Sequence, residues 1–120
     1  MNTQQGKQRI VEILGNNADA IIDNFQTISP DFAKYVVDFA YGDLYSRSGL
    51  TDKSREIAVV SSLIGQGKTG LPLHAHFLGM LNVGWTKEEI IELIIFLIGC
   101  VGFPSCVEAL GTLKEVLEQQ

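Results

Sequence analysis

The sequence predicts an all-helical protein, a single-domain helical bundle of about six to seven helices over residues 1–120. Apolar residues recur at the three-and-four spacing of helix faces along most of the chain, and no segment shows the alternation of a strand. The three prolines, Pro30, Pro72 and Pro104, each stand where a helix can begin. Because no repeat or linker-like tract interrupts the pattern, one helical domain is the simplest interpretation.

The first part of the chain predicts three helices. A short opening helix is expected to end at Gly15, and the next one follows with apolar residues at positions 18, 21, 22, 25 and 28. Ser29 and Pro30 supply an N-cap and a first-turn proline for a third helix. Gly42 is expected to end that helix. Its expected apolar residues are Phe32, Val36, Val37, Phe39 and Ala40.

The second part predicts four more helices. Thr51 can cap a helix that reaches about residue 67, and Pro72 opens a helix that runs to about residue 84. Thr86 and Glu89 have the spacing of a capping box for a helix over residues 90–101. A last helix follows the break at Gly102. Its expected shared face consists of Cys106, Leu110, Leu113 and Leu117.

The helix over residues 90–101 is apolar on nearly every side. Such a helix usually needs a partner chain, so we expect a homo-oligomer. The alternative is that neighbouring helices of the same chain cover it completely. The apolar stretch from residue 90 to 103 contains Glu92 and is shorter than the ~20 residues that a membrane-spanning helix needs.

The composition indicates which classes of partner and which cellular compartment to expect. The chain has 9 basic and 14 acidic residues and a net charge of −5 at pH 7, without a basic block, which argues against nucleic acids and anionic membranes. Residues 1–5 lack the apolar core of a signal peptide. Cys100 and Cys106 are too few for a disulfide scaffold, and we expect both to be buried and inert. The expected location is therefore the cytoplasm.

Glu56 is the most informative candidate residue. A step of 100° per residue places it on the apolar arc of its helix, so its carboxylate should be at least partly buried. Burial raises the pKa of a carboxyl group and a nearby cation lowers it, which suits a group that gives or takes protons near neutral pH. The alternative is a structural ion pair, for instance with Arg47 or Arg55.

The two histidines face different sides of one helix. His76 lies within the apolar arc, whereas His74 lies ~160° away around the same helix. They cannot chelate one metal ion together, and the chain has neither an HExxH pattern nor clustered cysteines, so we expect no metal. On its own, a histidine on an apolar face such as His76 is more often a hydrogen-bonded core residue than a catalyst. Trp85 either lines a pocket or holds helices together.

Four segments occur in an order that resembles the carboxymuconolactone decarboxylase family. They are residues 50–58 (LTDKSREIA), 76–86 (HFLGMLNVGWT), 88–90 (EEI) and 102–104 (GFP). The resemblance is strongest over residues 41–113. It implies an alkylhydroperoxidase-D-like helical fold that assembles into trimers or hexamers, and a reaction without a metal or an organic cofactor.

The resemblance also implies a function. In the enzyme that gives the family its name, 4-carboxymuconolactone loses carbon dioxide during the breakdown of aromatic compounds. Glu56 and His76 match positions implicated in proton relay in the wider family, so we expect His76, held by Glu56, to handle the proton. The substrate would be a small carboxylated molecule, with Arg47, Arg55, His74 and Trp85 as further candidates for binding it.

Three departures from the family pattern bear on the chemistry. Peroxidase-type relatives carry a CxxC pair shortly before the matched histidine, but here Thr69 and Pro72 stand at those positions. Thiol-dependent peroxidase chemistry is therefore the least favoured hypothesis. His74 and Cys100 also replace residues that are common in the namesake decarboxylases. The alternative function is a family member with another small-molecule substrate, or one with a binding or stress-accessory role.

Overall fold

The computed structural model describes residues 3–120, so Met1 and Asn2 of the N-terminal segment lie outside the described residues. Every regular element in the described part is a helix, which confirms the predicted all-helical class. Contacts divide the chain into two compact units, Met1–Asp52 and Lys53–Gln120. That the chain forms a single domain stays a prediction.

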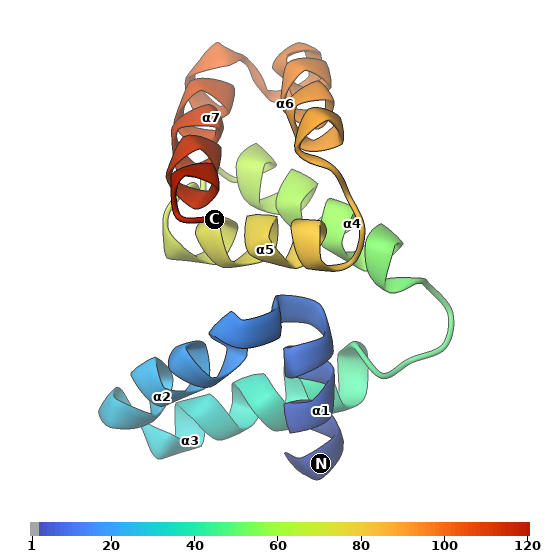
Figure 1. Ribbon diagram of the computed structural model, residues 1–120, viewed down its shortest axis with the longest axis vertical. Coiled ribbons are helices and arrows are strands. Elements are labelled where there is room, and N and C mark those ends of the chain that lie inside the picture. The colour runs from blue at the N-terminus through green and yellow to red at the C-terminus, as the bar shows by residue number, and fades with distance from the viewer. Residues whose placement is uncertain (1–2) are drawn as a thin grey trace. The chain divides into compact units, whose positions relative to one another are not determined.

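The first unit contains three α-helices, a 3₁₀ turn and a π-helix (Figure 1). In chain order they are α1 (Thr3–Leu14), η1 (the 3₁₀ turn, Gly15–Asn17), α2 (Ala18–Ile28), α3 (Pro30–Lys34) and η2 (the π-helix, Tyr35–Leu44). The opening helix ends beside Gly15, as predicted. Ser29 caps α3, because its side-chain oxygen accepts a 3.1 Å hydrogen bond from the Phe32 backbone N–H.

The third predicted helix is longer than expected, and it changes from α-helix (α3) to π-helix (η2) along its length. It continues as η2 to Leu44, so the prediction that Gly42 ends it is wrong. Gly42 is buried within η2 and does not have the positive φ that often ends a helix. A π-helix closes its hydrogen bonds over one residue more than an α-helix, which shifts the inward positions. Phe32 in α3 and Phe39 in η2, both expected on the apolar face, are 55% and 49% exposed. The inward apolar positions are Ala33, Val37 and Tyr41.

The π-helix also buries a charged residue. Asp38 has no exposed surface, and neither oxygen of its carboxylate has a hydrogen-bond partner. It lines a cavity of about 290 Å³ in the first unit, together with Lys7 and Lys34. An unpaired buried carboxylate destabilises a fold, so the apolar packing of this unit has to outweigh it.

The second unit consists of four α-helices. They are α4 (Asp52–Gly65), α5 (Leu71–Asn82), α6 (Lys87–Val101) and α7 (Phe103–Glu118), and α6 and α7 lie side by side in Figure 1. The predicted capping box of α6 is confirmed, with both hydrogen bonds between Thr86 and Glu89 in place. Gly102, at φ +90°, separates α6 from α7.

One core connects the four helices of this unit. Its buried members are Val60, Ile64, Leu73, Phe77, Met80, Ile90, Ile94, Leu97, Cys106, Ala109, Leu113 and Val116. The inner face of α7 is turned from the predicted one, because Ala109 and Val116 point inward while Leu110 is 50% exposed. The expectation that both cysteines are buried is also wrong, since Cys106 is buried but Cys100 lies on the exposed side of α6.

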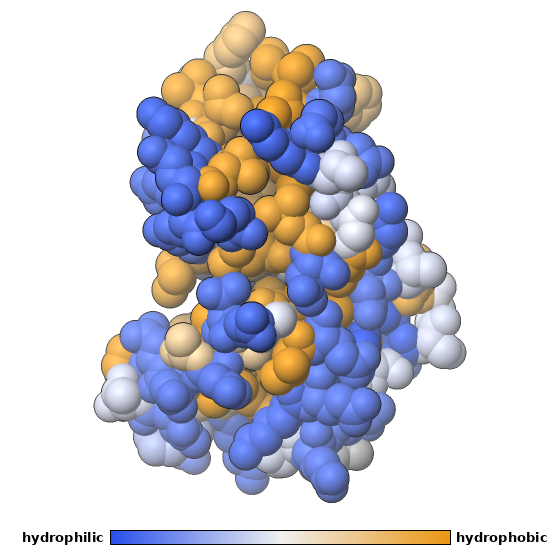
Figure 2. All heavy atoms as spheres, in the orientation of Figure 1, coloured by the Kyte–Doolittle hydropathy of each residue, from blue (hydrophilic) through white to orange (hydrophobic). Residues whose placement is uncertain are grey.

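The outer side of α6 exposes large apolar side chains, as its composition predicts. Ile95 and Phe96 are 54% and 70% exposed, and Phe103 at the start of α7 is 65% exposed. Figure 2 shows apolar surface over the α6 and α7 end of this unit. Within residues 3–120, no helix combines the length and apolar character required to cross a membrane.

A testable consequence concerns the contact between α1 and η2. A Cβ added to Gly6 would lie 2.0 Å from the carbonyl oxygen of Val37, which backbone atoms cannot accommodate without moving. We expect Gly6→Ala to lower the free energy of unfolding by about 1–3 kcal/mol, as overpacking does. Urea denaturation followed by circular dichroism measures the change.

Gly111 in α7 provides the matched control, because a Cβ there meets nothing within 4 Å. Gly111→Ala should leave the stability unchanged or raise it by up to about 1 kcal/mol, since alanine favours helix. Equal stability of the two variants would contradict the described contact.

Candidate active site

The site is built around a buried carboxylate on α4. Glu56 has no exposed surface, as its place on the apolar arc predicts, and it lies on the same buried side as Val60 and Ile64. These residues are four apart, so they follow one side of the helix. The same spacing that packs α4 on the core therefore carries the carboxylate into the interior.

His76 on α5 meets this carboxylate. Its Nδ1 lies 2.8 Å from Oε1 of Glu56, and 17% of its side chain is exposed. On α5, His76 lies close in sequence to the buried residues Leu73, Phe77 and Met80. The structure thus joins the two residues that the sequence singled out for proton transfer, although they are 20 positions apart.

The hydrogen bond has a direct chemical consequence. When Glu56 is ionised, its carboxylate only accepts, and the imidazole donates from Nδ1. In the neutral ring the other nitrogen, Nε2, then carries the lone pair, and in the protonated ring it carries a proton. The pair can accordingly hold the ring orientation fixed while Nε2 takes up or releases a proton.

Trp85 joins helices instead of presenting its polar edge to a cavity. Its indole Nε1 donates a 2.9 Å hydrogen bond to the backbone carbonyl of Lys53, at the start of α4. The ammonium group of Lys53 lies 4.4 Å from the centre of the Trp85 ring. Of the two interpretations that the sequence left open, these contacts favour the one in which Trp85 holds helices together.

The remaining candidate residues are His74, Arg55 and Arg47. Nε2 of His74 is 3.1 Å from Oε1 of Gln119 near the end of the chain. Arg55 is half-buried on α4 beside Glu56, whereas Arg47 is exposed and belongs to the first unit. Their suggested part in substrate binding stays a prediction. The contacts with Lys53 and Gln119 were not expected, because periodicity does not signal pairing between distant segments.

The positions matched to a peroxidase cysteine pair have another role here. The hydroxyl of Thr69 donates to Oε2 of Glu108 over 2.9 Å, and the backbone carbonyl of Thr69 accepts from the hydroxyl of Thr112. These bonds fasten the loop between α4 and α5 to α7. Among the described residues, no group of three or more His, Cys, Asp or Glu side chains is arranged to hold a metal ion.

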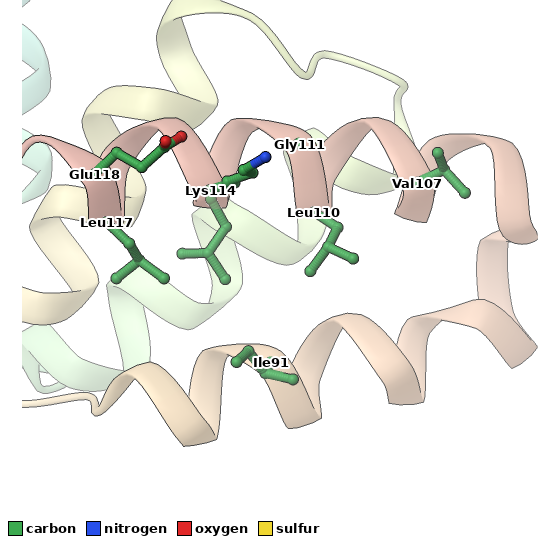
Figure 3. Close-up of a pocket in the computed structure, with 8 residues that line it drawn as sticks. Ile91, Val107, Leu110, Gly111, Lys114, Leu117 and Glu118 are labelled. Carbon is green, nitrogen blue, oxygen red and sulfur yellow. The ribbon is translucent and has the colours of Figure 1, made fainter.

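An apolar groove of about 490 Å³ lies elsewhere in the second unit, between α6 and α7 (Figure 3). In the close-up, Ile91 on α6 faces Leu110 and Leu117 on α7. Neither Glu56 nor His76 lines it. The groove is therefore distinct from the Glu56–His76 pair.

A family model described as the carboxymuconolactone decarboxylase family matches residues 30–115. The chain belongs to this family. The match includes Glu56, His76 and Trp85, so the resemblance inferred from the sequence motifs is confirmed.

Two relatives of this family member are named as decarboxylases. A 4-carboxymuconolactone decarboxylase from Acinetobacter baylyi is 28% identical over 116 residues, which cover 96% of this chain and 86% of the relative. A nitrosuccinic acid decarboxylase from Metarhizium robertsii is 36% identical over 75 residues, which cover 62% of this chain and 52% of the relative. The family and both relatives point to a decarboxylase.

Proposed function

We propose that this family member is a cofactor-free carboxy-lyase of the 4-carboxymuconolactone decarboxylase type, in which His76 handles the proton and Glu56 holds His76. The observation that carries the proposal is the 2.8 Å hydrogen bond between a buried carboxylate and a partly exposed imidazole. Such a pair suits a reaction that needs one positioned proton donor and no electrophilic cofactor.

The chemistry requires little beyond that donor. The bond between the substrate carbon and its carboxylate breaks, carbon dioxide leaves, and the electron pair moves into the conjugated lactone carbonyl. The resulting enolate takes one proton to give the product. In the proposed reaction Nε2 of His76 delivers this proton, and Glu56 stabilises the protonated ring through Nδ1.

The substrate has to be held by a second charged group. Arg55 is a candidate because it is half-buried on the helix that carries Glu56, and a guanidinium can bind a carboxylate through two parallel hydrogen bonds. Arg47 and His74 are other candidates from the sequence, whereas the contacts of Trp85, also named there, favour a role in holding helices together. The proposed substrate class is a small acid whose carbanion is stabilised by a neighbouring electron-withdrawing group.

The names of the two relatives supply two acids of this class. Their carbanions would be stabilised by an unsaturated lactone in one case and a nitro group in the other. Our first choice is 4-carboxymuconolactone, because the relative named for it aligns with 96% of this chain. Nitrosuccinic acid is the second substrate to test.

The proposal predicts carbon dioxide release from 4-carboxymuconolactone by the purified protein without added metal or cofactor. Glu56→Gln and His76→Ala should each lower kcat at least 100-fold, because general acid–base catalysis typically contributes about 10²–10⁴-fold. Loss of the lactone absorbance and trapping of carbon dioxide measure the reaction.

Glu88→Gln is the matched control, since it neutralises an exposed glutamate on α6 that makes no part of the pair. It should turn over like the unaltered protein. Full activity of both Glu56→Gln and His76→Ala would rule out the proposed mechanism, whichever substrate is used.

We also propose that the protein works as a homo-oligomer, a trimer or hexamer. The support is the exposure of Ile95, Phe96 and Phe103 along α6 and the start of α7. Large apolar surfaces of this kind usually mark an interface.

The assembly predicts a species of at least three chains in sedimentation at micromolar concentration. Phe96→Asp should shift the protein toward the monomer, because a charge on this face would have to be desolvated. Asp43→Asn, on the exposed side of the first unit, is the control and should leave the mass unchanged. A monomeric unaltered protein would contradict the proposal.

A further inference from the structure

Two residues outside the Glu56–His76 pair connect the helices that carry it. The indole N–H of Trp85 donates to the carbonyl of Lys53 over 2.9 Å, and the Lys53 ammonium lies 4.4 Å from the centre of the indole ring. Lys53 belongs to the first turn of α4, and Trp85 lies in the turn between α5 and α6. We call these contacts the Lys53–Trp85 clamp.

The turn holds Trp85 firmly in place. Gly84 precedes it at φ +111°, a conformation that side chains other than glycine rarely adopt. The backbone N–H of Trp85 donates to the carbonyl of Met80 over 2.9 Å. The next residue, Thr86, is the N-cap of α6. The backbone of Trp85 is therefore fixed between α5 and α6, and its indole ring contacts the start of α4.

The positive charge of Lys53 also acts on Glu89 in the capping box of α6. The capping hydrogen bond from the Thr86 backbone N–H lowers the pKa of Glu89, and the positive charge of Lys53 lowers it further. The stem of Lys53 passes near Gly84, where an added Cβ would come within 3.8 Å of its Cδ. Lys53 thus lies along the turn, between the indole ring and the capping box.

The clamp lies one helical turn from the catalytic carboxylate. Lys53 and Glu56 are three residues apart on α4, which is about 4.5 Å along the helix axis. A side-chain tip at about 5–6 Å from the axis moves by about 2 Å when the helix rotates by about 20°. Such a shift would break the 2.8 Å hydrogen bond to His76, because hydrogen bonds weaken steeply beyond their usual length.

We propose that Lys53 and Trp85 are positioning residues, and that their clamp fixes the rotation of α4 so that Glu56 stays bonded to Nδ1 of His76. The catalytic consequence rests on the proposed function. The expected effect on the hydrogen bond between Glu56 and His76 does not rest on it, because this hydrogen bond is present in the protein without substrate.

The experiment observes the Nδ1–H proton of His76 by NMR in the full-length, ligand-free protein with ¹⁵N-labelled histidine. A hydrogen-bonded imidazole proton gives a downfield signal that is protected from exchange with water. His76→Ala assigns the signal. Trp85→Phe keeps the aromatic face and removes the indole N–H, and Lys53→Met keeps the backbone carbonyl and removes the charge.

We expect Trp85→Phe to broaden or abolish the signal and to lower kcat about tenfold or more with little change in KM, since small misplacements of catalytic groups are costly. Lys53→Met should have a smaller effect of the same kind, about two- to threefold in kcat. Lys87→Met, which removes an exposed lysine from the first turn of α6, is the matched control and should leave the signal and kcat unchanged.

An unchanged His76 signal in a folded Trp85→Phe protein would overturn the clamp, whatever its activity. If that variant does not fold, as judged by circular dichroism, an unchanged signal in Lys53→Met overturns it. A protein that lacks decarboxylase activity but shows these NMR changes would contradict the proposed function and leave the clamp supported.

Discussion

The carboxylate of Glu56 is buried completely, and its hydrogen bond to His76 joins α4 to α5. A buried charge destabilises a protein unless polar groups compensate for it. His76 supplies such a polar group, and its hydrogen bond to Glu56 constrains how α4 meets α5. The apolar core holds the helices together, but packing alone tolerates small rotations, whereas a 2.8 Å hydrogen bond does not.

The hydrogen bond between Glu56 and His76 also links the fold to the proposed chemistry. Cysteine-dependent relatives place a thiol pair before the histidine, whereas here Thr69 and its neighbours use hydrogen bonds to fasten a loop to α7. In the proposed reaction, catalysis depends on an oriented imidazole supported by a carboxylate. That is sufficient for a decarboxylation, because the departing carbon dioxide needs no acceptor and the enolate needs one proton.

Much of the fold followed from local sequence signals. Ser29, the Thr86 capping box and Gly102 mark helix ends through short-range hydrogen bonds or backbone conformation, so the sequence predicted them correctly. The π-helix was missed, because the three-and-four spacing of apolar residues that predicts a helix does not distinguish α from π winding. Glu56 and His76 were singled out by periodicity and family resemblance. Their bond, and the contacts of Lys53, depend on how distant helices pack.

In the proposed reaction, one positioned proton donor completes a cofactor-free decarboxylation. Its most direct test is the reaction of 4-carboxymuconolactone in deuterium oxide, with the product analysed by NMR. A donor held by Glu56 should place a single deuterium on one face of the protonated carbon, because His76 can reach only one side of the bound enolate. Equal labelling of both faces would mean that bulk water supplies the proton, and would contradict the account.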